Sequence, residues 1–464
     1  MLLVVLVFAT ACGPAERDDL AVRLDAVVAP LFAPHRSGGV VLVAMDDNVV
    51  FRRAYGMADV ELEVAMQPDH VLGTGSITKQ FTAAAVLKLV AQGRIALDDD
   101  VRTFLPDFNT HGHRITIDQL LSHTSGLPDF IDREDFEALS RTDHSVSEIL
   151  ALTRDVPLHF EPGQGFRYSN SGYILLGAVI EHVSGRSYAE YLEEQLFRPL
   201  GMHDTWYGDD TRIIPRRARG YALRNGRLVR AEYLSMTLPH AAGAVFSTVD
   251  DMVTWDVALR SGTVMPLDLL EAAWSPRILP DGTPSGYGYG WKLCAFAGRP
   301  IVFHGGFVNG YLANATRLPD DGILVVALVN NDSDAPDPSL IARRIIRYLV
   351  TGSTDIQPYN LSETERAALV GRYAIGPDDM LQIMERDSVL YRRRNAGDAQ
   401  PLVALGPTQL TPAEEDVGWT LEFILGADGT AATVWMSLGC EPRFTARRIH
   451  TLDGEVGESS TAGQ

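Results

Sequence analysis

The stretch GTGSITKQFTAAAVLKLVAQGRI, residues 73–95, has a flexible start followed by a run whose apolar residues recur at helical spacing. Gly93 is a typical helix end. Ser76 and Lys79 lie three positions apart, on the first turn of the predicted helix. Two interpretations are open at this point. The Ser76 hydroxyl either caps an unpaired backbone N–H, as serine commonly does before an apolar helix, or is a nucleophile with Lys79 as its base.

Lysine usage favours the second interpretation. Arginine supplies nearly all of the 40 basic residues, and the three lysines are Lys79, Lys88 and Lys292. Arginine does not give up its proton in a protein, whereas a lysine removed from water can act as a base. A lysine one helical turn from Ser76 is therefore informative in so arginine-rich a chain.

The composition describes a globular protein large enough for more than one domain. The chain has 464 residues, of which 46% are hydrophobic and 22% charged. The net charge of −20 argues against nucleic acid or an anionic membrane surface as a partner. No internal stretch is long and apolar enough to span a bilayer.

The first residues, MLLVVLVFATAC, form an apolar run too short for a membrane helix and typical of a secretory signal. Residues 9–12 resemble a bacterial lipobox, although no basic residues precede the run and Ala9 stands where leucine is usual. We therefore expect a signal and linker segment over 1–19, lipidation at Cys12, export, and membrane attachment through that lipid only. Cys294 and Cys440 fall in different predicted domains, and we expect free buried thiols, although an exported chain could pair them.

The pattern along the chain predicts an α/β fold. It consists of a five-stranded antiparallel sheet flanked by helices, with a helical subdomain inserted between the strands. The expected elements are an amphipathic helix over 18–32, a hairpin over 39–56, helices and loops over 76–240, strands near 287–293, 311–317 and 322–331, and a helix over 339–350. These make one domain, 20–352. After a polar linker at 353–360, closely spaced short strands over 361–464 predict a small antiparallel, barrel-like domain.

Three further segments stand out, although each has an ordinary structural explanation as a turn, cap or bulge. They are Tyr168-Ser169-Asn170 before a predicted helix, His304-Gly305-Gly306 after an apolar strand, and SHTSGL over 122–127. Together with Ser76-Ile77-Thr78-Lys79, in this order and spacing, they resemble the motifs of the penicillin-recognising serine hydrolases. The similar branch holds class C β-lactamases, D-Ala-D-Ala carboxypeptidases and D-aminopeptidases, and the resemblance covers about residues 20–350.

The resemblance implies a role for each motif residue. Ser76 would be the nucleophile and Lys79 its base, on one face of the helix. Burial in an apolar helix would lower the pKa of Lys79 toward a useful range. Tyr168 would share the proton transfer and later serve the leaving group. Asn170 would orient the substrate amide and Lys79.

The resemblance also implies an oxyanion hole, built from the backbone N–H groups of Ser76 and Phe307. Gly305 and Gly306 would let the substrate approach the strand closely, as an added edge strand. His304 would help to bind a substrate carboxylate. Lysine is usual at this position in β-lactamases, and histidine would be a less reliable cation above its titration point.

The predicted function is that of an exported serine hydrolase that forms an acyl-enzyme at Ser76, without metal or organic cofactor. The expected partner is a small-molecule or peptide substrate, either a D-amino-acid peptide or a β-lactam, and the oligomeric state is left open. A short-chain carboxylesterase and a penicillin-binding sensor with negligible turnover are the alternatives, although Asn170 favours amide substrates. A Gly-x-Ser-x-Gly elbow is absent because Thr74 occupies the first glycine position. His111 and His113 lack a third metal ligand nearby, and His123 is expected to be structural.

Overall fold

The computed structural model describes residues 14–33, 36–209, 211–296, 298–333, 336–356, 358–376, 379–412, 419–438 and 441–449. The chain divides into two units between Thr354 and Asp355, inside the polar stretch expected as a linker. The lipobox-like segment with Cys12 lies outside the described residues. Helix α1 (Pro14–Val28) begins four residues before the amphipathic helix expected over 18–32. Within the ranges above, no helix is long and apolar enough to cross a membrane.

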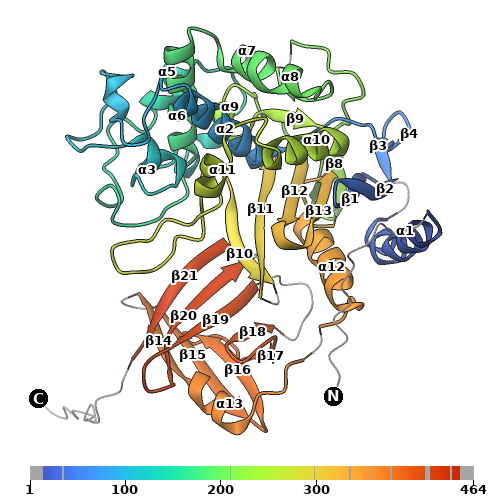
Figure 1. Ribbon diagram of the computed structural model, residues 1–464, viewed down its shortest axis with the longest axis vertical. Coiled ribbons are helices and arrows are strands. Elements are labelled where there is room, and N and C mark those ends of the chain that lie inside the picture. The colour runs from blue at the N-terminus through green and yellow to red at the C-terminus, as the bar shows by residue number, and fades with distance from the viewer. Residues whose placement is uncertain are drawn as a thin grey trace, which may run out of the picture. The chain divides into compact units, whose positions relative to one another are not determined.

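The first unit is built on a six-stranded antiparallel sheet, with two strands from the start of the unit and four from its end (Figure 1). In spatial order the strands are β10 (Lys292–Phe296), β11 (Arg299–Val308), β12 (Tyr311–Leu318), β13 (Ile323–Val329), β1 (Gly39–Met45) and β2 (Asn48–Tyr55). The α/β class is confirmed, but the prediction of five strands is wrong. A bulge is the ordinary structural alternative for Gly305 and Gly306, but the strand pairing continues through them, with Gly305 opposite Asn314 and Gly306 opposite Ala313.

The predicted hairpin at the start of the sheet is confirmed. β1 and β2 are joined at Asp46 and Asp47, whose φ angles are +45° and +66°. Two consecutive positive φ angles are those of a type I′ turn, which matches the twist of the flanking strands, and aspartate tolerates them better than most residues.

Helices cover both faces of this sheet. The terminal helices α1 and α12 (Pro338–Thr351) contact each other, and α12 packs on β12 and β13, while α10 (Val249–Arg260) contacts β1 and β13. The helical region gathers around α2 (Thr78–Ala91) and α6 (Asn170–Ser184), at the top of Figure 1. Its other helices are α3 (Ile117–Leu121), α4 (Phe136–Leu139), α5 (Val146–Ala151), α7 (Tyr188–Leu192), α8 (Arg198–Leu200), α9 (His240–Gly243) and α11 (Leu267–Ala273).

Short strands complete the first unit. They are β3 (Met57–Asp59), β4 (Val64–Ala65), β5 (Leu72–Gly73), β6 (Trp206–Tyr207), β7 (Tyr221–Arg224), β8 (Arg227–Arg230) and β9 (Val245–Ser247). β9 pairs with both β5 and β6, and so ties the start of α2 to chain more than 130 residues away in sequence. One cysteine expectation fails here. Cys294 in β10 is disulfide-bonded and is therefore not the free thiol that was expected. The expectation failed because it relied on domain assignment, which carries no information on disulfide geometry. Cys440 lies outside the described residues.

The second unit is a closed antiparallel barrel preceded by α13 (Glu363–Leu369). Its strands are β14 (Gly371–Gly376), β15 (Asp379–Arg386), β16 (Val389–Arg394), β17 (Gln400–Ala404), β18 (Gln409–Pro412), β19 (Trp419–Leu425), β20 (Ala431–Leu438) and β21 (Glu441–Arg448). Apolar side chains such as Tyr373, Leu381 and Phe423 fill the interior. The barrel-like prediction is therefore confirmed, with strand alternation as its physical basis.

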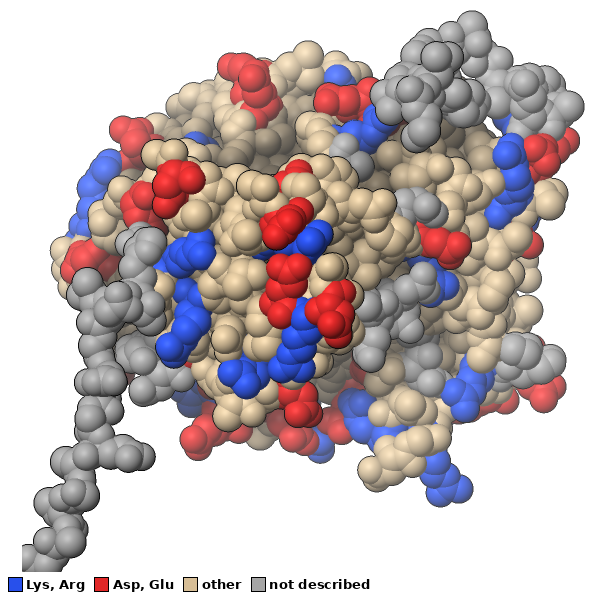
Figure 2. All heavy atoms as spheres, turned by 90° about the horizontal axis from the view of Figure 1, so that it is seen from below, with Lys and Arg blue, Asp and Glu red and all other residues tan. Residues whose placement is uncertain are grey.

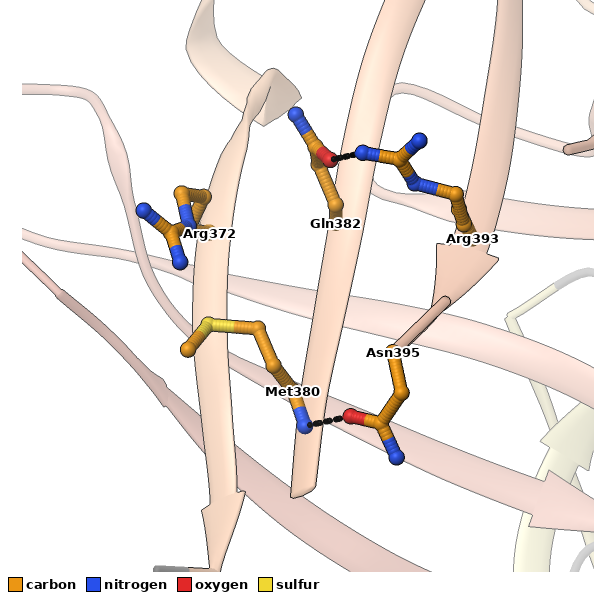
Figure 3. A pocket seen from close by; sticks show the side chains of 5 residues that line it. All are labelled: Arg372, Met380, Gln382, Arg393 and Asn395. Atoms are coloured by element: carbon orange, nitrogen blue, oxygen red, sulfur yellow. Dashed lines mark hydrogen bonds between the residues drawn. The ribbon is translucent and has the colours of Figure 1, made fainter. Parts of the chain in front are cut away.

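Polar side chains occupy the outer face of the barrel. Arg372, Gln382 and Arg393 are successive cross-strand partners on β14, β15 and β16. With Met380 and Asn395 they line a hollow of about 470 Å³, in which Arg393 donates a hydrogen bond to Gln382 at 2.7 Å (Figure 3). None of the sequence motifs contributes to this hollow. In the view of Figure 2, acidic and basic side chains are interspersed over the surface.

Candidate active site

The Ser76 segment is held by neighbouring chain on both sides. The backbone N and the hydroxyl of Thr74 both donate to the Val245 carbonyl, at 2.9 and 2.7 Å. Gly75 then takes a φ of +50°, in the region that favours glycine. Ser76 follows in a short 3-10 helix, η2 (Gly75–Ile77), immediately before α2. The pairing of β5 with β9 therefore fixes where Ser76 enters the site.

The Ser76 hydroxyl does not cap the helix. Neither η2 nor α2 has a side-chain hydrogen bond at its N-terminus. Instead, the Nζ of Lys79 lies 3.1 Å from the Oγ of Ser76, within hydrogen-bonding distance. The structure therefore favours the second interpretation of residues 73–95. The Ser76 hydroxyl is paired with Lys79 and does not cap the helix backbone.

Lys79 is completely buried although it carries an ionisable group. Its Nζ also donates to the Oδ1 of Asn170 and the carbonyl of Ala242, both at 2.8 Å, and lies 4.7 Å from the centre of the Tyr168 ring. Burial lowers the pKa of Lys79 well below its usual value, opposed by the nearby charge of Asp129 and reinforced by that of Lys292. A lysine whose pKa is lowered in this way is a better base for a neighbouring hydroxyl than a solvent-exposed lysine, because more of it is neutral at a given pH.

Asn170 is oriented by Asp129, a residue that the sequence had not singled out. The buried Oδ2 of Asp129 accepts hydrogen bonds from the backbone N of Asn170 at 2.7 Å and from its Nδ2 at 2.9 Å. Because the amide nitrogen of Asn170 points at Asp129, its oxygen must point at Lys79. Burial raises the pKa of Asp129, while its hydrogen bonds and Lys79 oppose that shift.

The two predicted oxyanion donors lie on chain segments that cross at very close range. A Cβ placed on Gly306 would lie 1.9 Å from the Thr74 carbonyl oxygen and 3.0 Å from the backbone N of Ser76. A Cβ on Gly75 would lie 2.4 Å from the backbone N of Phe307. Only glycine at both positions allows the η2 segment and β11 to approach this closely. The Ser76 and Phe307 N–H groups thus come from adjacent backbones, and their role as an oxyanion hole stays a prediction.

His304 is completely buried beneath this crossing. Its Nδ1 lies 2.5 Å from the Gly305 carbonyl, and its Nε2 lies 3.0 Å from the hydroxyl of Tyr287. Burial and the neighbouring lysine charges hold its pKa well below the usual range, so the ring is neutral near pH 7. Direct binding of a carboxylate by His304 stays a prediction, and a neutral, hydrogen-bonded ring does not favour it.

His123 serves the architecture of the site. Its Nδ1 accepts a hydrogen bond from the backbone N of Ser169 at 3.1 Å. Its ring packs against those of Tyr168, Tyr173 and Tyr287, with centroid distances of 4.3, 5.0 and 4.6 Å. His123, in the segment 122–127, therefore supports the Tyr168-Ser169-Asn170 motif, as expected for a structural histidine.

The other notable histidines lie outside this cluster. The Nδ1 of His113 is 2.9 Å from a carboxylate oxygen of Glu161. His111 has a φ of +54° in the turn that precedes His113. Within the described part of the chain, no group of three or more His, Cys, Asp or Glu side chains is placed to hold a metal ion.

The sequence interpretation missed three residues of the site: Asp129, Tyr287 and Lys292. Asp129 lies two residues after the SHTSGL segment (122–127), and Tyr287 lies in the YGYGW turn (287–291). Nothing in the local pattern distinguishes either from a turn residue. Lysine usage could have pointed to Lys292, because the chain has only three lysines. Two of them, Lys79 and Lys292, lie near the Tyr168 ring in this site.

A serine hydroxyl in η2, paired with a buried lysine on the first turn of the adjoining helix α2, defines a serine hydrolase of the penicillin-recognising kind. Comparison with known proteins gives the same assignment. The sequence profile described as Beta-lactamase matches residues 24–349, and the chain belongs to that family.

Individual relatives cover most of the chain. Penicillin-binding protein 4* of Bacillus subtilis is 29% identical over 90% of this chain and 97% of its own length. The D-aminopeptidase of Gluconobacter oxydans is 28% identical over 68% of this chain and 60% of its own length. Among solved structures, the octameric penicillin-binding protein homologue from Pyrococcus abyssi has a TM-score of 0.62 at 26% identity, covering 93% of this chain and 99% of that one. The D-stereospecific amidohydrolase from Streptomyces sp. has a TM-score of 0.63 at 25% identity, covering 72% and 99%.

Proposed function

We propose that this protein is an exported serine hydrolase that forms an acyl-enzyme at Ser76 and acts on D-amino-acid peptides or β-lactams. The observation that carries the proposal is the 3.1 Å distance between the Oγ of Ser76 and the Nζ of the buried Lys79. A hydroxyl is a poor nucleophile until a base takes its proton, and this lysine is desolvated and in place to do so.

The proposed acylation proceeds in two stages. Neutral Lys79 takes the Ser76 proton while Oγ attacks the substrate carbonyl, and the oxyanion is held by the Ser76 and Phe307 N–H groups. The tetrahedral intermediate then expels its amine, and the proton returns through Tyr168 to that nitrogen. Hydrolysis of the resulting ester by water, with proton transfer in the reverse sense, regenerates Ser76. Asn170 holds Lys79 in line throughout, because its amide oxygen lies 2.8 Å from the Nζ of Lys79.

The names of the relatives and the retained asparagine support the substrate class. Similar proteins include a D-aminopeptidase, a D-stereospecific amidohydrolase and a D-amino acid amidase from Ochrobactrum anthropi. Asn170 favours an amide over an ester substrate, because related esterases often lack the asparagine of the Tyr168-Ser169-Asn170 motif. A short-chain carboxylesterase and a penicillin-binding sensor that turns over negligibly are the competing outcomes.

Export and anchoring belong to the same proposal. They rest on the apolar run that ends at Cys12. A Cys12→Ala variant that partitions with the membrane fraction to the same extent as the native protein would remove the lipid anchor from the proposal.

The decisive experiment is covalent labelling of the Ser76→Ala and Lys79→Arg variants with a fluorescent fluorophosphonate and a fluorescent penicillin. Ser76→Ala should lose labelling and hydrolysis by several orders of magnitude. Lys79→Arg keeps the charge but cannot accept the serine proton, so we expect acylation to fall by roughly 100- to 10,000-fold. Lys88→Arg, on the same helix but outside the site, is the matched control. Labelling of Ser76→Ala at the native rate would end the proposal.

Turnover of a substrate panel then separates the competing outcomes. Nitrocefin, p-nitrophenyl acetate, a D-Ala-D-Ala peptide and a D-amino-acid anilide distinguish a β-lactamase, an esterase, a carboxypeptidase and an aminopeptidase. Stable labelling by penicillin without turnover of any member would assign the sensor role.

A further inference from the structure

The hollow on the outer face of the barrel, called here the arginine hollow, is lined by Arg372, Met380, Gln382, Arg393 and Asn395 (Figure 3). Arg372 on β14 and Arg393 on β16 flank Gln382 on β15, and the strand pairing places the three side by side. Neighbouring strands lie about 4.8 Å apart, so the two arginine backbones are separated by about 10 Å. Two long cationic side chains therefore stand on either side of one amide.

These two arginines differ from most others in their lack of an anionic partner. Within the part of the chain that the structure describes, no carboxylate pairs with Arg372 or Arg393. The two acidic residues of β15, Asp379 and Glu385, each pair with another arginine. The whole chain has 60 acidic and 40 basic residues, so carboxylates are plentiful. Positive charge without a counter-ion is therefore a local feature of the arginine hollow.

The hydrogen-bonding groups left over in the arginine hollow are donors. Arg393 donates to the Oε1 of Gln382 at 2.7 Å. Among the described residues, the Nε2 of Gln382 and the guanidinium of Arg372 have no acceptor, and the Nε of Arg393 is buried without one. The Oδ1 of Asn395 already accepts from the backbone N of Met380, at 2.7 Å. A lining with unpaired donors and occupied acceptors is suited to an oxyanion.

A second hollow, of about 490 Å³, adjoins the arginine hollow, and the two share Arg372 and Gln382. Glu385 also lines the second hollow, but its charge is met by an arginine of α13. The apolar side chains that line it are those of Ala367, Val370, Ile383 and Met384. An anion bound by the two arginines would therefore have an apolar surface beside it.

We propose that the arginine hollow binds a phosphate ester that carries an apolar group. A carboxylate has two oxygens and is satisfied by one guanidinium fork, whereas a phosphate group offers three and can accept hydrogen bonds from both sides. The apolar group would lie over the second hollow. This site belongs to the barrel, so the inference goes beyond the proposed function and does not depend on acylation at Ser76.

Isothermal titration calorimetry of the full chain with hexyl phosphate tests the proposal. We expect hexyl phosphate to bind at least about tenfold more tightly than inorganic phosphate, because part of its alkyl chain leaves water. Hexanol, which lacks the anion, should show no binding. Arg372→Gln and Arg393→Gln should each weaken binding of hexyl phosphate by about 10- to 100-fold, the range of a hydrogen bond to a charged group. Arg372→Lys keeps the charge without the fork and should recover part of the affinity.

Arg227→Gln is the matched control, because Arg227 is an exposed arginine of β8 in the first unit. Its loss should leave the affinity unchanged. Arg372 is also exposed, so its replacement does not disturb the packing of the barrel interior. Native affinity in both Arg372→Gln and Arg393→Gln would overturn the proposal, and so would failure of the native chain to bind hexyl phosphate.

Two further measurements sharpen this result. Hexanoate binding as tightly as hexyl phosphate would overturn the choice of a phosphate group. Fluorophosphonate labelling of Ser76 reports on the proposed function separately, and we expect it to be unchanged in Arg372→Gln and Arg393→Gln. Loss of labelling in these two variants would overturn the independence of the arginine hollow from the candidate active site.

Discussion

The two units bury very different kinds of side chain. The barrel interior is apolar, formed by residues such as Leu381, Leu410 and Phe423. The first unit has an apolar core as well, yet it also buries Lys79, His123 and His304 to 1% exposure or less. Burying polar groups costs stability unless each finds a partner, so a cluster of them needs a reason beyond folding. Packing alone accounts for the side chains buried in the barrel, but it does not account for the polar side chains buried in the first unit. This difference indicates that the chemistry is located in the first unit.

The largest expected effect concerns the barrel. Phe423→Ala removes a buried ring that packs edge-on against Tyr373 at 5.8 Å, and should lower the free energy of unfolding by about 3 to 5 kcal/mol. Ile424→Ala, at the next position and 41% exposed, should change it by less than about 1 kcal/mol. Scanning calorimetry of the full chain measures both. Equal losses would show that strand alternation does not govern this unit.

A smaller effect tests the close crossing in the active site. Gly75→Ala would place a methyl group 2.4 Å from the backbone N of Phe307, so the two N–H donors must move apart. Loss of one oxyanion donor costs roughly 100- to 1,000-fold in kcat. Gly93→Ala is the matched control, because Gly93 also has a positive φ, +68°, but no atom lies within 4 Å of the added carbon. Gly93→Ala should cost stability through backbone strain and leave the labelling rate of Ser76 intact. Equal labelling rates for the two variants would contradict a role for this crossing.

The smallest effect concerns the buried carboxylate beside the lysine. Asp129→Ala removes the acceptor of both hydrogen bonds that orient Asn170. It should reduce kcat/KM for acylation about tenfold, the value of a charged hydrogen bond. Asp129→Asn retains an oxygen acceptor but removes the negative charge that raises the pKa of Lys79. Because the lysine must be neutral to act, acylation should rise with pH through the pKa of Lys79, and this limb should move to lower pH in Asp129→Asn.

The pH profile of fluorophosphonate labelling measures that shift. Lys292→Gln removes a positive charge that lowers the pKa of Lys79, so its limb should move to higher pH. Tyr168, His123 and His304 also face the lysine, and the two histidines stay neutral over this range. Shifts of the two variants in the same direction would show that the charges of Asp129 and Lys292 do not set the profile.

Local chemistry in the sequence predicted much of this molecule. Asp46-Asp47-Asn48 predicted the first hairpin, and Gly93, with a φ of +68°, lies just past the end of α2, as expected of a helix-end glycine. Closely spaced short strands predicted a β domain over 361–464. The pairing of Ser76 with Lys79 followed from one helical turn of separation, which brings two side chains onto the same face whatever surrounds them.

Tertiary structure decided the contacts between segments that are distant in sequence. Whether the Ser76 hydroxyl caps the helix or pairs with Lys79 was settled by the folded chain, in which Asn170 and Ala242 supply the other contacts of the Lys79 Nζ. The convergence of Asp129 and Lys292 on Lys79 joins segments that are far apart in sequence. Local patterns reach only a few residues along the chain. The protonation state of a buried group depends instead on the charges around it in space and on its removal from water. Only the folded chain determines both.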